Sequence, residues 1–143
     1  MRDKVSINVR QDVSLNWTLE IKPGEKLLIV CGTSTSGLEG STPRLKDVLF
    51  AKRKFQDKPQ PSDEMPSKFS GRVHMIWQSQ TISLSIKRVD LSDEGFYMCE
   101  VSTLFVTARE KISLEVIGKC DVFVFFFFCT LSVFGLAFSR AVD

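Results

Sequence analysis

The residues of this sequence that most readily do chemistry are its cysteines, and the chemistry that they indicate is disulfide formation. Cys31 and Cys99 lie in the body of the chain, and Cys120 and Cys129 lie near its end. None belongs to a CxxC pair, so neither a zinc ribbon nor a thioredoxin-like site is indicated. Two distant cysteines in strand-like segments fit one long-range disulfide, formed in an oxidising compartment. Two free buried thiols are the alternative interpretation.

No set of residues indicates catalysis, so we expect a binding protein rather than an enzyme. The single histidine, His74, lies in a strand without an evident nucleophile that would complete a triad. Asp63 and Glu64 form a loop pair that is typical of solvated carboxylates. Neither a metal-ligand cluster nor a phosphate-binding glycine loop occurs, so we expect no metal and no cofactor. The net charge of +2 is too small to indicate nucleic-acid binding.

The elements that position the two body cysteines are predicted to be β-strands. Residues from Val13 to Ile21 alternate strictly between apolar and polar types, which is the period of a half-buried strand. Pro23-Gly24 predicts a turn. Lys26–Cys31 is predicted as the next strand, and the Gly, Ser and Thr-rich residues 32–43 as a loop.

Further short strands are predicted along the rest of the chain. They cover Lys46–Lys54, Val73–Trp77, Ile82–Ile86, Tyr97–Val101 and Ile112–Val116. Residues 56–68 contain three prolines and cannot form a central strand. A series of about eight short strands without a substantial helix predicts an all-β fold, an antiparallel sandwich.

One motif indicates which kind of sandwich the chain forms. Residues 93–99 match the pattern D-x-G-x-Y-x-C. Gly95 permits a tight turn, and the hydroxyl of Tyr97 can bond to backbone upstream, which forms a tyrosine corner. Cys99 would face inward and reach Cys31 across the two sheets. Asp93 needs a cation, and Arg72 is its expected salt-bridge partner.

With these residues in place, the sequence resembles the immunoglobulin V-set family over about residues 10–117. The run Met65–Val73, followed by Ser83–Ile86 and Asp93–Cys99, is most similar to butyrophilin-like and related costimulatory-ligand domains. The resemblance implies an immunoglobulin-like V-type antiparallel β-sandwich. It also implies a cell-surface protein that regulates T cells or mediates adhesion through the sheet of strands C, F and G. The expected partner is a protein counter-receptor on another cell, or a second copy of the chain.

A candidate partner face follows from the alternation around Tyr97. If Tyr97 and Cys99 point inward, Phe96 and Met98 should point outward, with Glu100 beside them. Exposed apolar residues on that strand would form a patch suited to a partner. The alternative is that a long loop covers them.

The sequence departs from the family in its aromatic core. The family's Trp on strand C is absent, and Trp17 and Trp77 lie on other predicted strands. Phe50 is the candidate substitute, because it would place a ring against the disulfide; the alternative is that it is an edge residue. Residues 104–116 also lack the F-G-x-G bulge of antigen receptors, so a rearranged receptor chain is disfavoured.

Asn16-Trp17-Thr18 is an N-glycosylation sequon. Strand alternation places Asn16 on the solvent face, so its modification is sterically feasible. An unmodified surface asparagine is the alternative.

The end of the chain is apolar and predicts a membrane segment. Residues 122–138 are uncharged and would span about 25 Å as a helix, close to the ~30 Å hydrocarbon core. We therefore expect a V-set domain at 1–117, a juxtamembrane segment at 118–121, a transmembrane helix at 122–138 and a short cytosolic tail at 139–143.

The disulfide sets the expected orientation: a single-pass type I protein of the plasma membrane, with its domain outside. No apolar leader occurs near Met1, so we expect a signal peptide to be missing from this sequence. The alternative is a soluble or partner-dependent V-set subunit or decoy. In that case the tail is translated intron, because codons for Gly118-Lys119-Cys120 can contain a splice-donor-like sequence.

Overall fold

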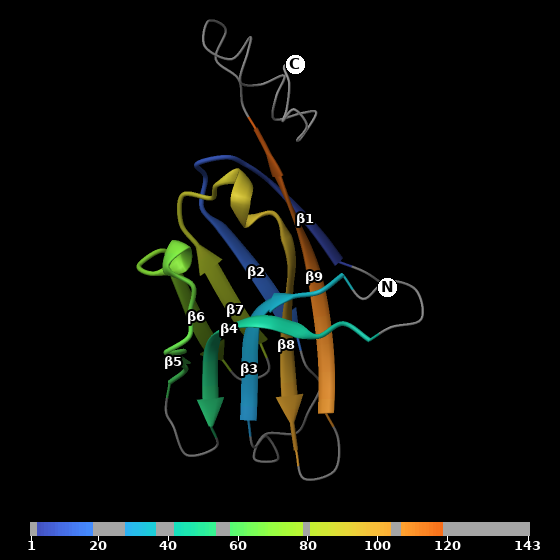
Figure 1. Ribbon diagram of the computed structural model, residues 1–143. Helices are drawn as coiled ribbons and strands as arrows, with labels where there is room; N and C mark the ends of the chain where they lie inside the picture. Colours follow the sequence, from blue (N-terminus) through green and yellow to red (C-terminus); the bar gives the residue numbers. More distant parts are fainter. Residues whose placement is uncertain are drawn as a thin grey trace, which may run out of the picture.

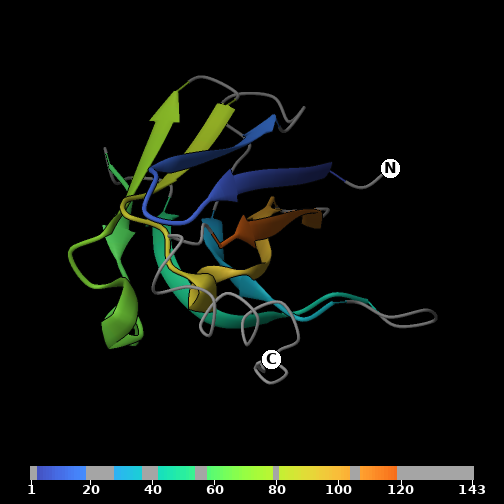
Figure 2. The ribbon, with the colours of Figure 1, turned by 90° about the horizontal axis from the view of Figure 1, so that it is seen from above.

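The chain forms a sandwich of two β-sheets, one behind the other in Figure 1 and one above the other in Figure 2. The computed structural model describes residues 3–18, 28–36, 42–53, 58–78, 81–103 and 107–118. In these residues β-strands dominate, and the helices are single 3₁₀ turns. The predicted all-β immunoglobulin-like sandwich is therefore confirmed.

The larger sheet, here called the front sheet, has the strand order β1-β9-β8-β3-β4-β5. β1 runs parallel to β9, and all other neighbours are antiparallel. The order β9-β8-β3-β4-β5 is that of strands G, F, C, C′ and C″ of a variable-type domain. The strands are β1 (Asp3–Asn8), β3 (Leu28–Ser34), β4 (Leu45–Arg53), β5 (Gln60–Pro61), β8 (Gly95–Ser102) and β9 (Thr107–Ile117).

The smaller sheet, here called the back sheet, has the antiparallel order β2-β7-β6. It consists of β2 (Val13–Thr18), β7 (Thr81–Ile86) and β6 (Val73–Gln78), the equivalents of strands B, E and D. Burial alternates along β2 and β7, as the sequence period predicts. Their inner residues pack against those of the front sheet and form one core. The largest fully buried side chains in it include Trp17, Tyr97, Phe69, Leu15 and Leu49.

Two short helices and one short strand complete the described fold. η1 (Ser67–Phe69) precedes β6, and η2 (Leu91–Asp93) precedes β8. Among its described residues, the proline-rich region contributes one short strand, β5, at the edge of the front sheet, as expected for residues that cannot donate to a ladder. The strand β1 was not predicted.

The disulfide lies within the front sheet, and the expected bridge between the two sheets is wrong. Cys31 of β3 and Cys99 of β8 are direct partners in the antiparallel register, with their Cα atoms 4.1 Å apart. In antibody domains the disulfide joins strands B and F across the sandwich. Here the first cysteine lies on strand C, the neighbour of strand F in the same sheet, so the covalent link crosses one ladder instead of the core.

The core tryptophan lies on strand B instead of strand C. Trp17 lies on β2, the B strand, and is almost fully buried. Its indole N–H donates to the backbone carbonyl of Glu110 on β9, 3.0 Å away in the front sheet. The family resemblance implied a cysteine on strand B and a tryptophan on strand C. Here Trp17 lies on strand B and Cys31 on strand C, so the two residue types are exchanged.

Phe50 is an aromatic residue in direct register with the disulfide. It lies on β4, directly opposite Cys31 in the register. It is buried, and β4 lies between β3 and β5, so Phe50 is not an edge residue. Phe50 thus lies opposite the disulfide as expected, but on strand C′, so the expectation that it takes the place of the strand C tryptophan is wrong.

Candidate functional site

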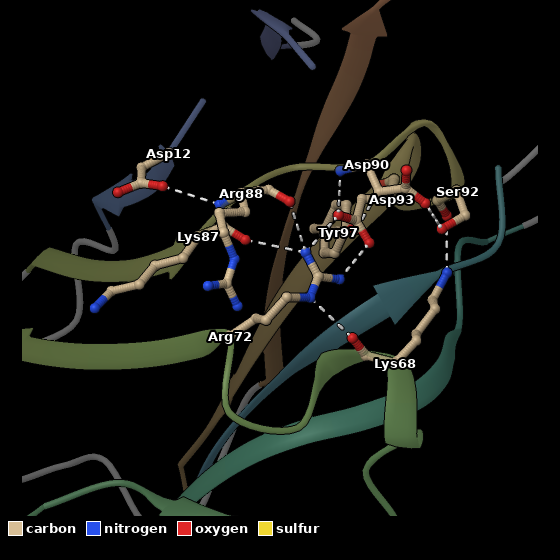
Figure 3. A network of polar contacts seen from close by, with 9 residues as sticks. All are labelled: Asp12, Lys68, Arg72, Lys87, Arg88, Asp90, Ser92, Asp93 and Tyr97. Carbon is tan, nitrogen blue, oxygen red and sulfur yellow. Dashed lines mark hydrogen bonds and ion pairs between the residues drawn. The ribbon is translucent and has the colours of Figure 1, made fainter. Parts of the chain in front are cut away.

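Arg72 and Asp93 form the centre of a polar network at the end of the sandwich that carries η1 and η2 (Figure 3). The guanidinium makes two parallel contacts with the carboxylate, Nη1 to Oδ2 at 3.0 Å and Nη2 to Oδ1 at 2.9 Å. The Asp93 side chain is 0% exposed and that of Arg72 is 15% exposed. The pKa of Arg72 is raised, chiefly because the Asp93 carboxylate accepts its hydrogen bonds.

The remaining donors of Arg72 bind backbone carbonyls. Its Nε donates to Lys68, and its Nη1 donates to Lys87 and Arg88. One side chain therefore joins η1, the end of β7 and η2. The network is a structural one, because its polar groups satisfy one another.

Tyr97 completes the corner that the motif predicts. Its hydroxyl donates to the backbone carbonyl of Asp93 at 2.6 Å, and the ring meets Phe69 edge to face with centroids 6.4 Å apart. Burial raises the pKa of the Tyr97 hydroxyl, and the negative charge of Asp93 adds to the effect.

Asp90 and Ser92 stabilise η2 from its other side. The Asp90 backbone N–H donates to Asp93 Oδ2, within a capping box. The Ser92 hydroxyl donates to the Asp90 carboxylate, which is the main reason that the pKa of Asp90 is lowered. Lys68 Nζ donates to the Ser92 carbonyl at 2.8 Å, so η1 and η2 are also joined directly.

The outer face of the front sheet differs from the predicted partner face at its central residue. Met98 points away from the core, as alternation requires, but its side chain is 0% exposed. The expectation that Met98 is exposed is therefore wrong, and the alternative of a covering segment holds. The cover comes from the end of β3 and the start of β4.

This covering segment, here called the arm, consists of residues 33–36 and 42–47. The Thr35 N–H donates to the Arg44 carbonyl at 2.8 Å, which pairs the two sides of the arm. Figures 1 and 2 show it crossing in front of β8 and β9. Ser34 contacts the Met98 sulfur at 3.9 Å, and Lys111 of β9 donates to the Ser36 carbonyl.

Phe96 and Glu100 remain partly exposed on either side of Met98. The Lys111 ammonium lies 4.6 Å from the centre of the Phe96 ring. Arg109 Nε donates to Glu100 at 2.9 Å, in a surface pair whose side chains are 42% and 24% exposed.

Beyond the arm, a row of residues crosses four strands of the front sheet. Ala51, Val30, Glu100 and Arg109 are successive register partners on β4, β3, β8 and β9. Cys31 points into the core, so Val30 and the rest of this row face outward. We call this row the central row. Sequence reasoning missed three of its members, because only their pairing, and not their local pattern, brings them together.

A hollow of about 560 Å³ lies between the arm, η1 and the start of β8. Its lining includes arm residues 33–36, Lys46 and Lys68, together with Phe96 and Ser92. Lys68 is engaged by the Ser92 carbonyl, and Thr33 Oγ1 donates to Asp47 Oδ2 at 3.3 Å. The Lys68 ammonium thus joins the two helices, and the Thr33 hydroxyl joins the two sides of the arm.

Asn16 lies in the middle of β2 with its side chain exposed. The Ser83 hydroxyl of β7 donates to its Oδ1 at 2.5 Å. Asn16, the first residue of the sequon, is therefore on the outer face of the back sheet, as alternation predicted.

Within the described ranges, no group of three or more His, Cys, Asp or Glu side chains could hold a metal ion. No helix among the described residues is long and apolar enough to cross a membrane. The described residues end at Gly118. The predicted membrane span at 122–138 therefore lies outside them, as do residues 119–121, the predicted tail at 139–143, Cys120 and Cys129.

Several solved structures share this fold. Tim-1 aligns with a TM-score of 0.61 and 20% identity, over 85% of this chain and 97% of its own. Bovine butyrophilin aligns with a TM-score of 0.60 and 19% identity, over 83% of this chain and 53% of its own. The second immunoglobulin domain of the mouse polymeric immunoglobulin receptor aligns with a TM-score of 0.59 and 10% identity, over 83% and 99%. At these identities the likeness shows the fold.

Sequence comparison gives the family. No curated protein sequence matches the chain. The family model of the immunoglobulin domain matches residues 18–106, more than half of the chain. Together with the strand order, the Arg72–Asp93 pair and the tyrosine corner, this match shows that the chain belongs to the immunoglobulin domain family.

Proposed function

We propose that this domain binds a protein partner at a cell surface, through the part of the front sheet that the arm leaves open. The central row carries the proposal. It presents the small apolar side chains of Val30 and Ala51 beside the charged pair Glu100 and Arg109. An apolar centre next to oriented charges is the composition of a protein-binding face, and it would favour one partner over others by charge complementarity.

The location outside the cell is part of the same proposal. It is supported by the disulfide between Cys31 and Cys99, since such bonds persist in oxidising compartments. The fold is shared with butyrophilin and Tim-1, and we propose for this chain the role that its resemblance to butyrophilin-like domains implies, in regulating immune cells or in adhesion. The apolar segment 122–138 would anchor the domain as a type I membrane protein.

The test exchanges the two charges of the central row. The double variant Glu100→Arg/Arg109→Glu keeps the pair within the domain and reverses the charges that a partner meets. We expect binding of the tetramerised ectodomain to a panel of leukocytes and epithelial cells, measured by flow cytometry, to fall about tenfold or more, which corresponds to about 1.4 kcal/mol.

The matched control is His74→Glu, a charge change on the exposed outer face of the back sheet. It should leave binding unchanged. Equal losses in both variants, or no loss in the double variant, would place the binding face elsewhere. Sedimentation of the same variants tests whether the partner is a second copy of the chain.

A further inference from the structure

Strand β2 forms an edge of the back sheet and lacks the features that usually protect such an edge. Among the described residues it pairs only with β7. Its sequence VSLNWT contains no charged residue and no proline. An uncharged edge strand with high β-propensity offers its free backbone groups to another chain, and natural proteins usually block this with charge, proline or cover.

The middle of this edge carries an attachment point for cover. Asn16 is exposed at the centre of β2 and begins the sequon Asn16-Trp17-Thr18. Ser14 and Thr18, two residues to either side, are exposed on the same face. Along β2, the outer face around Asn16 is therefore polar, uncharged and exposed.

The orientation of the Asn16 amide suits attachment at its nitrogen. The Ser83 hydroxyl of β7 donates to Oδ1, so the oxygen points toward the neighbouring strand. Because the oxygen and nitrogen of an amide diverge, Nδ2 points away from Ser83. An N-linked sugar is attached at Nδ2 and leaves Oδ1 free to accept, so the hydrogen bond would persist and direct the sugar away from β7.

We propose that Asn16 carries an N-linked glycan that covers the free edge of β2. The inference rests on the proposed extracellular location, because the modifying enzyme acts in the secretory pathway. In the reaction Asn16 Nδ2 forms a bond to C1 of an oligosaccharide held on a lipid diphosphate. The bond from C1 to the phosphate oxygen breaks, the lipid diphosphate leaves with the electron pair, and Nδ2 loses one proton to a base.

The fold also determines when this reaction takes place. Trp17, the middle residue of the sequon, is almost fully buried, and its indole N–H donates to the Glu110 backbone carbonyl. In the closed sandwich the sequon cannot enter another active site as an extended peptide. The glycan is therefore added to the unfolded chain, before β2 joins the sandwich.

The experiment compares four versions of the full chain behind a secretory leader in mammalian cells. The natural chain and Thr18→Ser keep a sequon, whereas Thr18→Ala and Asn16→Gln remove it. We expect one discrete mass shift, removed by an endoglycosidase, in the first two and its complete loss in the last two. Thr18→Ser and Thr18→Ala change the same exposed position, so they separate the sequon from any effect on folding.

A second measurement tests the cover itself. Lysine-directed cross-linking on intact cells should give a larger fraction of dimers and oligomers for Thr18→Ala and Asn16→Gln than for Thr18→Ser. A mass shift without this difference would overturn the role in covering the edge.

The outcomes also separate this inference from the proposed function. A natural chain that reaches the surface with its disulfide formed but without a mass shift would overturn the glycan and leave the binding role standing. A natural chain that stays inside the cell despite the leader, with its disulfide unformed and no mass shift, would overturn both.

Discussion

Asp93 shows at the scale of a single residue what a buried charge requires. Its carboxylate is fully buried and accepts two hydrogen bonds from Arg72 and one from the Asp90 N–H, while its backbone carbonyl accepts from Tyr97. Removing such a group from water costs several kcal/mol unless a paired charge and further donors offset it. The residues of the D-x-G-x-Y-x-C motif are thus parts of one electrostatic unit.

The tyrosine of this unit predicts a specific response to alkaline pH. Burial raises the pKa of Tyr97, so the folded state binds the phenolic proton more tightly than the unfolded state does. The corresponding stability is complete below the unfolded pKa of about 10 and is lost as the pH rises beyond it. Tyr97→Phe should lower the free energy of unfolding at pH 7 by about 1 kcal/mol, through loss of the bond to the Asp93 carbonyl.

Urea unfolding at pH 7 and above pH 10 checks this prediction. The difference in stability between the natural protein and Tyr97→Phe should shrink at the higher pH, since only the natural protein has this titrating group. A difference that stays constant or grows would show that Tyr97 does not titrate as its burial requires.

The residue scale also shows where sequence reasoning is reliable. The spacing of Asp93, Gly95, Tyr97 and Cys99 encodes a turn followed by a strand, so the geometry of that corner follows from local rules. The alternation at Met98 correctly gives the direction of its side chain. It contains no information about a segment from another part of the chain that lies over it.

At the scale of elements, Gly32 determines how the arm leaves the front sheet. The register between β3 and β4 shifts at Cys31/Gly32 and again at Thr33/Ser34, as in a β-bulge. A Cβ atom at Gly32 would lie 1.9 Å from the Asp47 carbonyl oxygen. Only glycine allows the two strands to approach this closely where the arm turns across β8 and β9.

Gly32→Ala should therefore lift the arm and destabilise the domain. We expect a loss of about 1–3 kcal/mol, because the contact is with backbone that cannot rotate away. Hydrogen exchange at Thr35 and Asp47 should increase together with the fall in the urea midpoint, since their N–H groups bond across the arm.

Gly118→Ala is the control for this change. An added Cβ there would lie no closer than 3.7 Å to a neighbouring atom, and we expect a change within about 0.5 kcal/mol. If Gly32→Ala were equally neutral, the close approach of β3 and β4 would not be required for the arm.

The arm also explains why the elements were predicted unequally well. The regular strands β2, β6 and β7 follow the period of two, which burial on one face imposes. Residues 32–43 are rich in Gly, Ser and Thr and predict a loop, yet β3 continues through Ser34. Pairing with β4 and β8 overrides local propensity there, and the bulge hides the alternation.

At the scale of the whole molecule, no disulfide joins the two sheets in the described residues, so side-chain packing and hydrogen bonds hold one sheet against the other. The disulfide joins β3 to β8 within the front sheet, whereas Trp17 reaches from β2 to the β9 backbone across the core. The exchange of cysteine and tryptophan between strands B and C could not be read from their spacing, because both arrangements bury both side chains. It divides the stabilising roles: the disulfide restricts the unfolded chain, and the tryptophan packs the folded one.

This division predicts different signatures for the two groups in denaturant. The double variant Cys31→Ala/Cys99→Ala opens a loop of 68 residues, which in the chain-entropy model lowers the free energy of unfolding by about 4 kcal/mol. Its unfolded state is more expanded, so the dependence of stability on urea, the m-value, should rise.

Trp17→Phe loses the indole hydrogen bond to Glu110 and leaves a cavity, for a cost of about 2–4 kcal/mol with an unchanged m-value. Urea unfolding of both variants measures midpoint and slope together. An unchanged slope in the double variant would mean that the disulfide acts mainly in the folded state, by holding β3 against β8, and a raised slope in Trp17→Phe would mean that the tryptophan orders the unfolded chain.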